Sequence, residues 1–185
     1  MMKRIFDIFF SIVLIFISCP LFVLIAIAIF LQDRGPVFFK QKRVGYKGKL
    51  FFIFKFRTMI VKAEQKGTYF TKDNDSRITK LGKLLRKTSL DELPQLLNVF
   101  IGDMSFVGPR PDVIQQKELY TKKEWRARCS VRPGITGLAQ ATLRSQATIE
   151  ERKSMDLQYV KNKSFLFDLK IILLTLKQII TKGGN

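Results

Sequence analysis

The sequence contains no histidine, only two cysteines, and fewer than half as many acidic as basic residues. The lack of histidine removes the commonest general base and the commonest metal ligand. Cys19 and Cys129 do not form a disulfide framework or a zinc-binding spacing, which is typical of a reducing compartment. The shortage of acids leaves a formal net charge of +18. Such a charge attracts polyanions: nucleic acid, anionic lipid headgroups or nucleotide phosphates.

The chain has 185 residues, of which 46% are hydrophobic and 26% charged. This composition excludes a disordered chain and indicates one domain with a short extra element. The first 31 residues contribute only Lys3, Arg4 and Asp7 to the charge, so nearly all of the positive charge lies beyond them.

Residues 8–31 form an uncharged apolar run of 24 residues. As a helix this run would rise about 36 Å, enough to cross the core of a bilayer. A signal peptide is the competing interpretation, but the run is too long for an ordinary signal-peptide core and no small-x-small cleavage site follows it. The run therefore predicts a membrane segment.

Pro20 lies near the middle of this segment and should bend or break the helix, with Ser18 free to bond a released carbonyl. Lys3 and Arg4 precede the run and a more basic segment follows it, so both flanks favour the cytoplasmic side. A straight crossing remains open, because proline is tolerated inside spanning helices. The flanks favour a re-entrant helix-break-helix hairpin over residues 1–32, broken at Pro20, which leaves 33–185 as a cytosol-facing domain.

The remainder predicts an α+β fold. Residues 37–44 and 49–59 are expected to form a β-hairpin, in which Phe52, Phe54 and Phe56 share one face and Lys55 and Arg57 the other. Residues 66–76 are polar and predict a loop. Helices are expected over 78–87, with one basic face that solvent alone would also explain, over 89–100, and over 148–161. A last helix at 165–180 either lies in the membrane interface, which we favour, or closes the core.

The stretch SLDELPQL places two carboxylates, Asp91 and Glu92, among basic residues. Ser89 and Glu92 fit a capping box, and acids in a first turn favour the helix dipole, so a structural role is open. Pro94 fits that box poorly. The surrounding cations are expected to lower the pKa of Asp91 and keep it ionised.

A reactive role is the alternative. Arg110 stands between Pro109 and Pro111, whose rings restrict the backbone, and a restricted arginine suits a bidentate phosphate contact. A carboxylate that attacks phosphorus needs such cations and a metal that bridges phosphate oxygens. Mg²⁺ suits this site because it requires only one or two carboxylates.

These stretches resemble the bacterial sugar transferase family, the small monotopic phosphoglycosyl transferases. The resemblance runs from Lys3 to Gln140 and includes GPVFFKQKRVG, FKFRTM, RPGITGLAQ and, most specifically, TSLDELPQLLNV with GDMSFVGPRP. The C-terminal YVKNKSFLFDLKII is similar as well.

The resemblance implies transfer of a phospho-sugar from a UDP-sugar to polyprenyl (undecaprenyl) phosphate, with release of UMP. This is the first membrane step of bacterial glycan assembly, on the cytoplasmic face of the inner membrane. Asp91 would be the nucleophile, form a covalent phospho-sugar intermediate and lie beside Mg²⁺, with Glu92 as a base or a positioning group. The resemblance also places Arg86 near the phosphates and the Pro109-Arg110-Pro111 motif at the nucleotide. Apart from the resemblance, we expect Arg57 and Arg132 to help bind substrate, and Thr136 and Gln140 to lie near the site.

The family's membrane helix breaks at a Ser-Pro pair, whereas here Cys19 separates Ser18 from Pro20. Two other functions stay open beside catalysis: a membrane-anchored basic module that binds nucleic acid or anionic lipid, and a silent scaffold. Because no recognised nucleic-acid motif is present and the aromatic residues are expected to be buried in strands, we expect membrane lipids and no nucleic acid as partners. The intact Asp91-Glu92 pair argues against the scaffold. No feature of the sequence defines the sugar or the oligomeric state.

Overall fold

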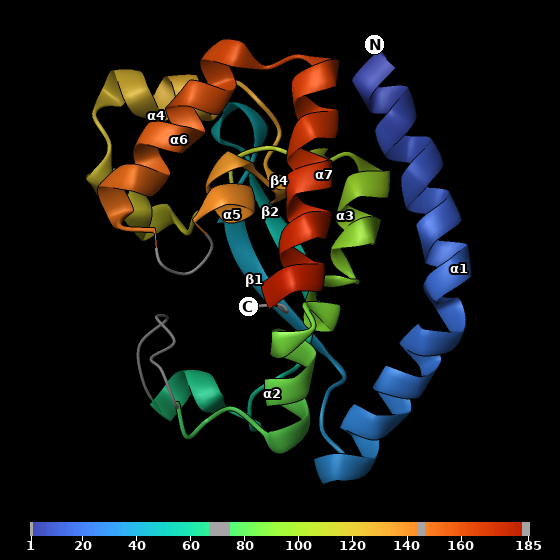
Figure 1. Ribbon diagram of the computed structural model, residues 1–185. Helices are drawn as coiled ribbons and strands as arrows, with labels where there is room; N and C mark the ends of the chain where they lie inside the picture. Colours follow the sequence, from blue (N-terminus) through green and yellow to red (C-terminus); the bar gives the residue numbers. More distant parts are fainter. Residues whose placement is uncertain (1, 67–74, 144–146, 183–185) are drawn as a thin grey trace.

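The computed structural model describes residues 2–66, 75–143 and 147–182 and has the expected α+β composition (Figure 1). Its helices and strands are α1 (Met2–Asp33), β1 (Phe38–Val44), β2 (Leu50–Phe56), α2 (Lys80–Lys87), α3 (Gln95–Ile101), β3 (Ser105–Val107), α4 (Lys122–Arg128), β4 (Gly134–Thr136), α5 (Leu138–Thr142), α6 (Ile149–Asn162) and α7 (Phe165–Lys182). Short 3-10 turns are η1 (Tyr46–Gly48), η2 (Ala63–Lys66), η3 (Leu90–Glu92) and η4 (Ile114–Leu119). Most of the loop expected at 66–76 lies outside the described residues.

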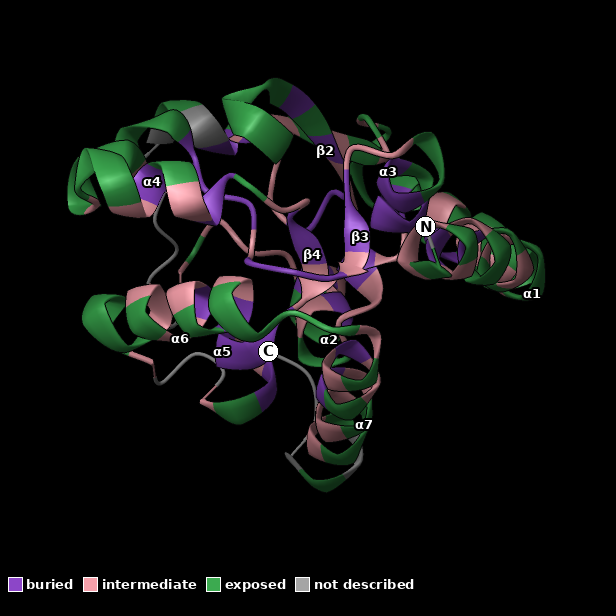
Figure 2. Cartoon of the chain, turned by 90° about the horizontal axis from the view of Figure 1, so that it is seen from above, coloured by how far each residue is buried: buried purple, intermediate pink, exposed green. Residues whose placement is uncertain are grey.

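α1 is one helix that bends part-way along its length (Figure 1). The helix is not broken at Pro20, because a proline removes a single N–H donor and the turns on either side can continue around it. The Ser18 hydroxyl donates to the carbonyl of Leu14 at 2.5 Å, and not to that of Phe16, which Pro20 leaves without its usual donor. Among the described residues, α1 is the one helix long and apolar enough to cross a bilayer. It lies along one side of the molecule with mostly exposed residues (Figure 2).

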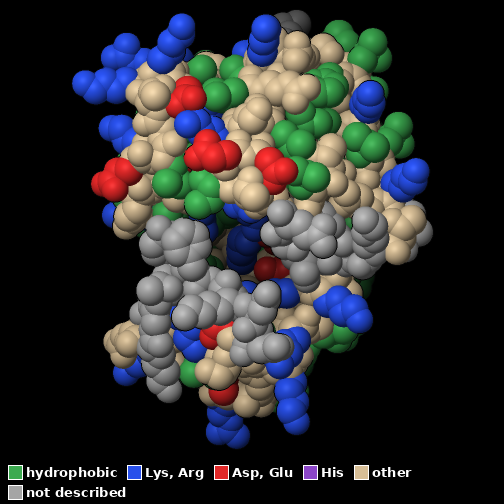
Figure 3. Space-filling model, turned by 60° about the vertical axis from the view of Figure 1, so that its left-hand side comes forward, with side chains coloured by type: hydrophobic (Ala, Val, Ile, Leu, Met, Phe, Trp, Pro, Cys, Tyr) green, Lys and Arg blue, Asp and Glu red, His purple; other side chains and the backbone are tan. Residues whose placement is uncertain are grey.

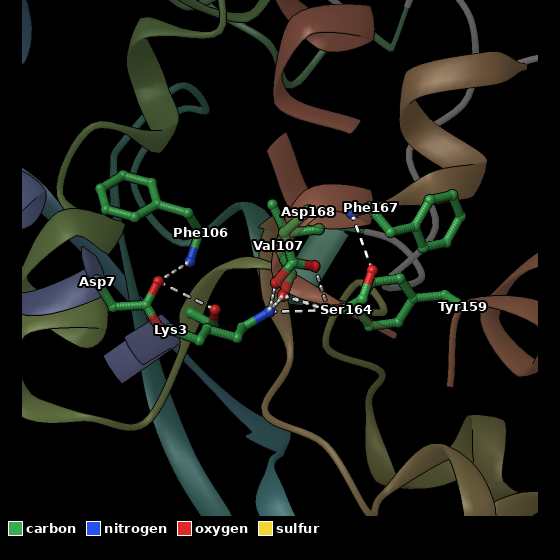
Figure 4. A network of polar contacts seen from close by, with 9 residues as sticks. Lys3, Asp7, Phe106, Val107, Tyr159, Ser164, Phe167 and Asp168 are labelled. Carbon is green, nitrogen blue, oxygen red and sulfur yellow. Dashed lines mark hydrogen bonds and ion pairs between the residues drawn. The ribbon is translucent and has the colours of Figure 1, made fainter. Parts of the chain in front are cut away.

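The first turns of α1 are bound to the rest of the protein by buried and partly buried polar contacts (Figure 4). The Lys3 ammonium donates to the Val107 carbonyl at 2.8 Å, to the Tyr159 hydroxyl at 2.8 Å and to the Asp168 carboxylate at 2.6 Å. Asp7 is 2% exposed and accepts two hydrogen bonds from β3. These contacts join the N-terminus of α1 to β3, α6 and α7.

The last turns of α1 are bound to the same body. Asp33 accepts two hydrogen bonds from the Arg57 guanidinium, at 2.8 and 2.5 Å, and Ile29 is buried against β2 and α2. Between these ends the apolar side chains face outward, with Phe16 76% and Ile17 71% exposed. α1 is therefore bound to the body at both ends, and the stretch around Phe16 and Ile17 between them is exposed.

β1 and β2 form the predicted antiparallel hairpin, with a register that runs from Phe38 opposite Phe56 to Val44 opposite Leu50. The faces differ from the expected burial. On the face with Lys55, Phe51 and Ile53 point into the core. On the opposite face Phe52 is 48% exposed, and only Phe56, at the end of the strand, is buried, against α1 and α2.

Asn98 of α3 completes the free edge of β2. Its side-chain amide donates to the Phe52 carbonyl at 2.7 Å and accepts from the Phe54 N–H at 3.0 Å, as a neighbouring strand would. Asn98 is fully buried, so α3 is fixed against the hairpin. The leucines and the phenylalanine of α3 are only partly buried: Leu96 is 5% exposed, but Leu97 and Phe100 point outward.

The C-terminal helices close the core around the parallel pair β3–β4. In α7, Ile171 is fully buried, whereas Leu166 is 77% and Leu173 67% exposed. One face of α7 therefore closes the core, which was one of the two alternatives for this helix. Its other face is apolar and exposed.

Candidate active site

The Asp91-Glu92 pair lies where two short helices meet. α2 ends at Lys87, Ser89 adopts a left-handed conformation with φ of 58°, and η3 carries the two acids. α3 begins directly after Pro94, a place where the missing N–H costs no helical hydrogen bond. The predicted capping box does not form, because the Ser89 side chain makes no cap hydrogen bond and Glu92 has other partners.

Glu92 is bound by two cations. Its carboxylate accepts from Lys55 at 2.6 Å and from Arg110 at 2.7 Å, and the residue is only 9% exposed. Burial alone would raise the pKa of Glu92, but the charges and hydrogen bonds of Arg110 and Lys55 outweigh it and hold the pKa well below its usual range. A carboxylate that releases its proton so readily is a poor general base and a good clamp for two cations.

Asp91 differs from its neighbour. It is 8% exposed, and none of the described residues gives it a hydrogen bond or an ion pair. Burial raises the pKa of Asp91 because it outweighs the attraction of Lys55 and of the nearby arginines, so the predicted lowering was wrong in sign. Asp91 is therefore an available carboxylate beside bound cations. Acidic and basic side chains are visible together inside a hollow of the molecular surface (Figure 3).

Arg86 turns inward from the basic face predicted on α2, while the lysines of that helix are exposed. Its Nε donates to the Thr58 hydroxyl at 2.9 Å. Gly82 makes this approach possible, since a Cβ there would lie 2.0 Å from the Thr58 carbonyl oxygen. The close contact between α2 and the end of the hairpin places Arg86 near enough to Asp91 for their opposite charges to attract one another.

The loop that carries Arg110 is fixed from behind. Its flanking prolines are buried, and its carbonyl accepts a hydrogen bond from Arg128. Arg128 is 4% exposed and lies between Asp112 at 3.0 Å and Asp156 at 3.1 Å. Burial raises the pKa of Asp156 to about 6 despite the nearby Arg128. This network ties α4 and α6 to the loop and sets the position of Arg110.

Two basic residues of the hairpin belong to the site and were not predicted. Lys55 holds Glu92, and Arg43 donates to the Pro111 carbonyl at 3.0 Å. The Nε of Arg43 is buried with no hydrogen-bond partner among the described residues, and burial, with the charge of Arg110, lowers the pKa of Arg43 to about 10. The alternation of the strand had placed Lys55 on one face with Arg57, but only the long-range contact with Glu92 distinguishes the two.

The other predicted residues lie in different surroundings. Arg57 pairs with Asp33, and Arg132 donates to the Gly102 carbonyl at 2.8 Å. The Thr136 hydroxyl bonds that of Thr175 at 2.7 Å, and the amide nitrogen of Gln140 is buried without a partner among the described residues. In the part of the chain that the structure describes, none of these four makes a hydrogen bond or ion pair with Asp91 or Glu92.

No group of three or more potential metal ligands occurs among the described residues. The free carboxylate of Asp91 nevertheless suits Mg²⁺, which prefers oxygen and takes most of its ligands from water and phosphate. The donor set therefore fits a magnesium ion that arrives with a diphosphate, and does not fit a metal held by protein alone.

The sequence profile described as bacterial sugar transferase matches residues 1–182. The chain belongs to the bacterial sugar transferase family. The resemblance seen in the sequence is thereby confirmed, and the match covers both α1 and the α+β body.

Relatives within the bacterial sugar transferases differ in length. The uncharacterized sugar transferase EpsL of Bacillus subtilis is 43% identical over 183 residues, which are 99% of this chain and 89% of the relative. The exopolysaccharide production protein ExoY of Rhizobium meliloti is 38% identical, with coverage of 100% and 88%. The UDP-glucose:undecaprenyl-phosphate glucose-1-phosphate transferase of Escherichia coli is 40% identical, but the match covers 100% of this chain and only 41% of that protein.

Proposed function

We propose that this protein transfers a phospho-sugar from a UDP-sugar to undecaprenyl phosphate and releases UMP. Relatives that carry this activity in their names are about 40% identical over the whole of this chain. The observation that carries the proposal is the contrast between the two acids. Glu92 forms ion pairs with two cations, whereas Asp91 beside it has no hydrogen-bond or ion-pair partner among the described residues.

The reaction has two displacements at phosphorus. An oxygen of Asp91 attacks the phosphorus that bears the sugar, a new O–P bond forms, and the bond from that phosphorus to the bridging oxygen breaks, so UMP leaves with the bonding electrons. A phosphate oxygen of undecaprenyl phosphate then attacks the same phosphorus and releases the Asp91 carboxylate. The product is a lipid diphosphate sugar, and no proton needs to be stored between the steps.

The cations around Asp91 make an attack by one anion on another feasible. Arg86, Arg110 and Lys55 approach from three different elements, and Glu92 holds two of them in place. Preorganised positive charge in a partly buried site stabilises the charge that develops on the phosphoryl oxygens. We assign Glu92 to positioning, because its low pKa makes it unsuitable as a base.

Further groups extend the donor site. Arg43, which has no ion-pair partner among the described residues, lies beside the Pro109-Arg110-Pro111 loop and suits a donor phosphate. Arg57 and Arg132 need to leave their present partners to reach a substrate, so we place them outside the site. Mg²⁺ held by Asp91 and the donor phosphates would neutralise phosphate charge.

The environment we propose is the cytoplasmic face of the inner membrane, with α1 re-entrant. The polar contacts of Lys3 and of Asp33 lie on one folded body, and a body with this many charges stays on one side of a bilayer. A helix with both ends on that body enters and leaves through one leaflet, and its exposed middle supplies the inserted part. The positive charge beyond α1 favours the cytoplasmic side.

The test is UMP release by the purified full chain in detergent, with Mg²⁺, undecaprenyl phosphate and a panel of UDP-sugars. Asp91→Asn should lower the rate by about three orders of magnitude or more. With a donor labelled in its sugar, label should remain on the parent protein when the lipid is omitted and should be absent from Asp91→Asn. Asp103→Asn, at a carboxylate with no assigned role, is the control. Retained release and labelling in Asp91→Asn would refute the assignment.

A further inference from the structure

One side of the β-hairpin lies opposite the face from which Lys55 reaches Glu92. We call it the outer hairpin face, and it consists of Phe38, Lys40, Lys42, Leu50, Phe52 and Phe54. Its apolar members are unusually open: Phe38 is 45%, Leu50 56% and Phe52 48% exposed. The register pairs Lys40 with Phe54 and Lys42 with Phe52, so these four side chains are cross-strand neighbours on one surface. Phe38 and Leu50 stand at its two ends, opposite the buried Phe56 and Val44.

Lysines and rings are paired on this face. The ammonium of Lys42 lies 5.7 Å from the centre of the Phe52 ring, and that of Lys40 lies 5.4 Å from the Phe54 ring. In water, so much exposed aromatic surface on one short hairpin is unfavourable. At the boundary of a membrane the same composition is favourable, because rings enter the acyl region while lysines reach the headgroups.

The outer hairpin face adjoins α1 through the buried ring of Phe56. The ring of Phe38 stacks on that of Phe56, with 5.6 Å between the ring centres, and the ring of Phe22 in α1 lies 5.1 Å from that of Phe56. At the other edge of the hairpin, Asn98 ties β2 to α3, a helix that exposes Phe100 and two further apolar side chains. The hairpin therefore adjoins the helix best suited to enter the bilayer.

We propose that the outer hairpin face docks on an anionic leaflet, with Phe38, Leu50 and Phe52 at the acyl boundary and Lys40 and Lys42 at the headgroups. A second copy of the chain is a poorer occupant, since each copy carries a net charge of +18 and would bring its lysines against those of the other. Because Lys55 leaves the opposite face of β2 to hold Glu92, docking sets the depth of the active site relative to the lipid surface.

The experiment uses the full chain in nanodiscs and measures tryptophan fluorescence. The unmodified chain has one tryptophan, the buried Trp125, which supplies the baseline. Phe52→Trp adds a reporter on the outer hairpin face. Ile149→Trp is the matched control, because Ile149 is 55% exposed on α6, on the other side of the molecule from α1 (Figures 1 and 2).

We expect lipids brominated on their acyl chains to remove most of the emission added at position 52 and to leave that at position 149 unchanged. Acrylamide, which stays in the aqueous phase, should quench the emission at position 149 and leave that at position 52 largely unchanged. Strong acrylamide quenching at position 52 without quenching by bromolipid would overturn the proposal. Protection from both quenchers would also overturn it, because another protein surface would then cover the face.

The lysines are tested in the same background. Lys40→Gln with Lys42→Gln should lower the ratio of docked to undocked hairpin in anionic nanodiscs by about 30-fold, as expected for two cations at a charged surface. In nanodiscs of neutral lipid the pair of substitutions should have no effect. Equal quenching with and without the two lysines in anionic lipid would refute their contact with headgroups. The readout does not depend on turnover, so it is separate from the test of the transferase reaction.

Discussion

Replacing Lys55 by methionine removes one of the two cations on Glu92. The pair is well shielded, with the Lys55 side chain 18% and the Glu92 side chain 10% exposed, and its atoms are 2.6 Å apart. Loss of one partner from a buried ion pair costs about 3–5 kcal/mol when the remaining charge is left alone. Here Arg110 stays on the same carboxylate at 2.7 Å, so we expect a smaller loss of about 2 kcal/mol in the free energy of unfolding.

The effect on catalysis should be larger and should depend on pH. Lys55 makes the strongest attraction that opposes the burial of Asp91, so its loss raises the pKa of Asp91 further. In the proposed reaction Asp91 attacks as the carboxylate, so activity should disappear as the pH falls through its pKa. The variant should therefore lose activity at a higher pH than the parent, and its kcat should fall about 100- to 1000-fold even where Asp91 is fully ionised.

The assay is UMP release across a pH series, with thermal unfolding measured on the same samples. Lys122→Met is the matched control, because Lys122 is exposed in the first turn of α4. A Lys55→Met protein with an unshifted acid limb and a kcat within a few-fold of the control would refute the placement of this cation beside the reacting carboxylate.

Three further changes test the surrounding structure. Lys3→Met and Asp168→Leu should each destabilise the protein in detergent. Their double-mutant cycle should give a coupling free energy of about 1–2 kcal/mol, a modest value because Lys3 is partly exposed. Additive effects on thermal unfolding would contradict the contact. Gly82→Ala should lower the free energy of unfolding by about 1–3 kcal/mol, because the new Cβ would lie 2.0 Å from the Thr58 carbonyl oxygen. In an uncrowded helix the same change stabilises. A raised unfolding temperature would therefore refute this packing. Arg57→Gln and Asp33→Asn should cause similar losses of stability and leave the KM for the UDP-sugar unchanged, and a rise of KM in Arg57→Gln alone would return Arg57 to the substrate site.

The features found from the sequence depend on local pattern. The hairpin follows from strand alternation and a glycine-containing turn, and α1 follows from an uninterrupted apolar run. The acid pair stood out because charge of the opposite sign surrounds it. Which residues complete the site was harder to predict, because Lys55 and Arg110 reach Glu92 from positions 37 and 18 residues away.

The errors have a common physical origin. A capping box at Ser89 and a depressed pKa for Asp91 are reasonable for an exposed helix start, but this turn is buried, and burial reversed the second expectation. The inward face of the hairpin was also missed, since alternation defines two faces without indicating which one meets the core. In both cases tertiary packing decides, and a local pattern carries no information about packing.

The contact between Lys3 and Asp168 joins residues 165 positions apart. A ribosome completes the acceptor only when almost all of the chain has been made, so the N-terminal helix emerges long before its anchor exists. During that interval Lys3 has neither the carboxylate nor the Tyr159 hydroxyl that it binds in the finished protein. The contact between Lys3 of α1 and Asp168 of α7 therefore forms late in biogenesis. Chains truncated before α7 should reach the bilayer without this contact.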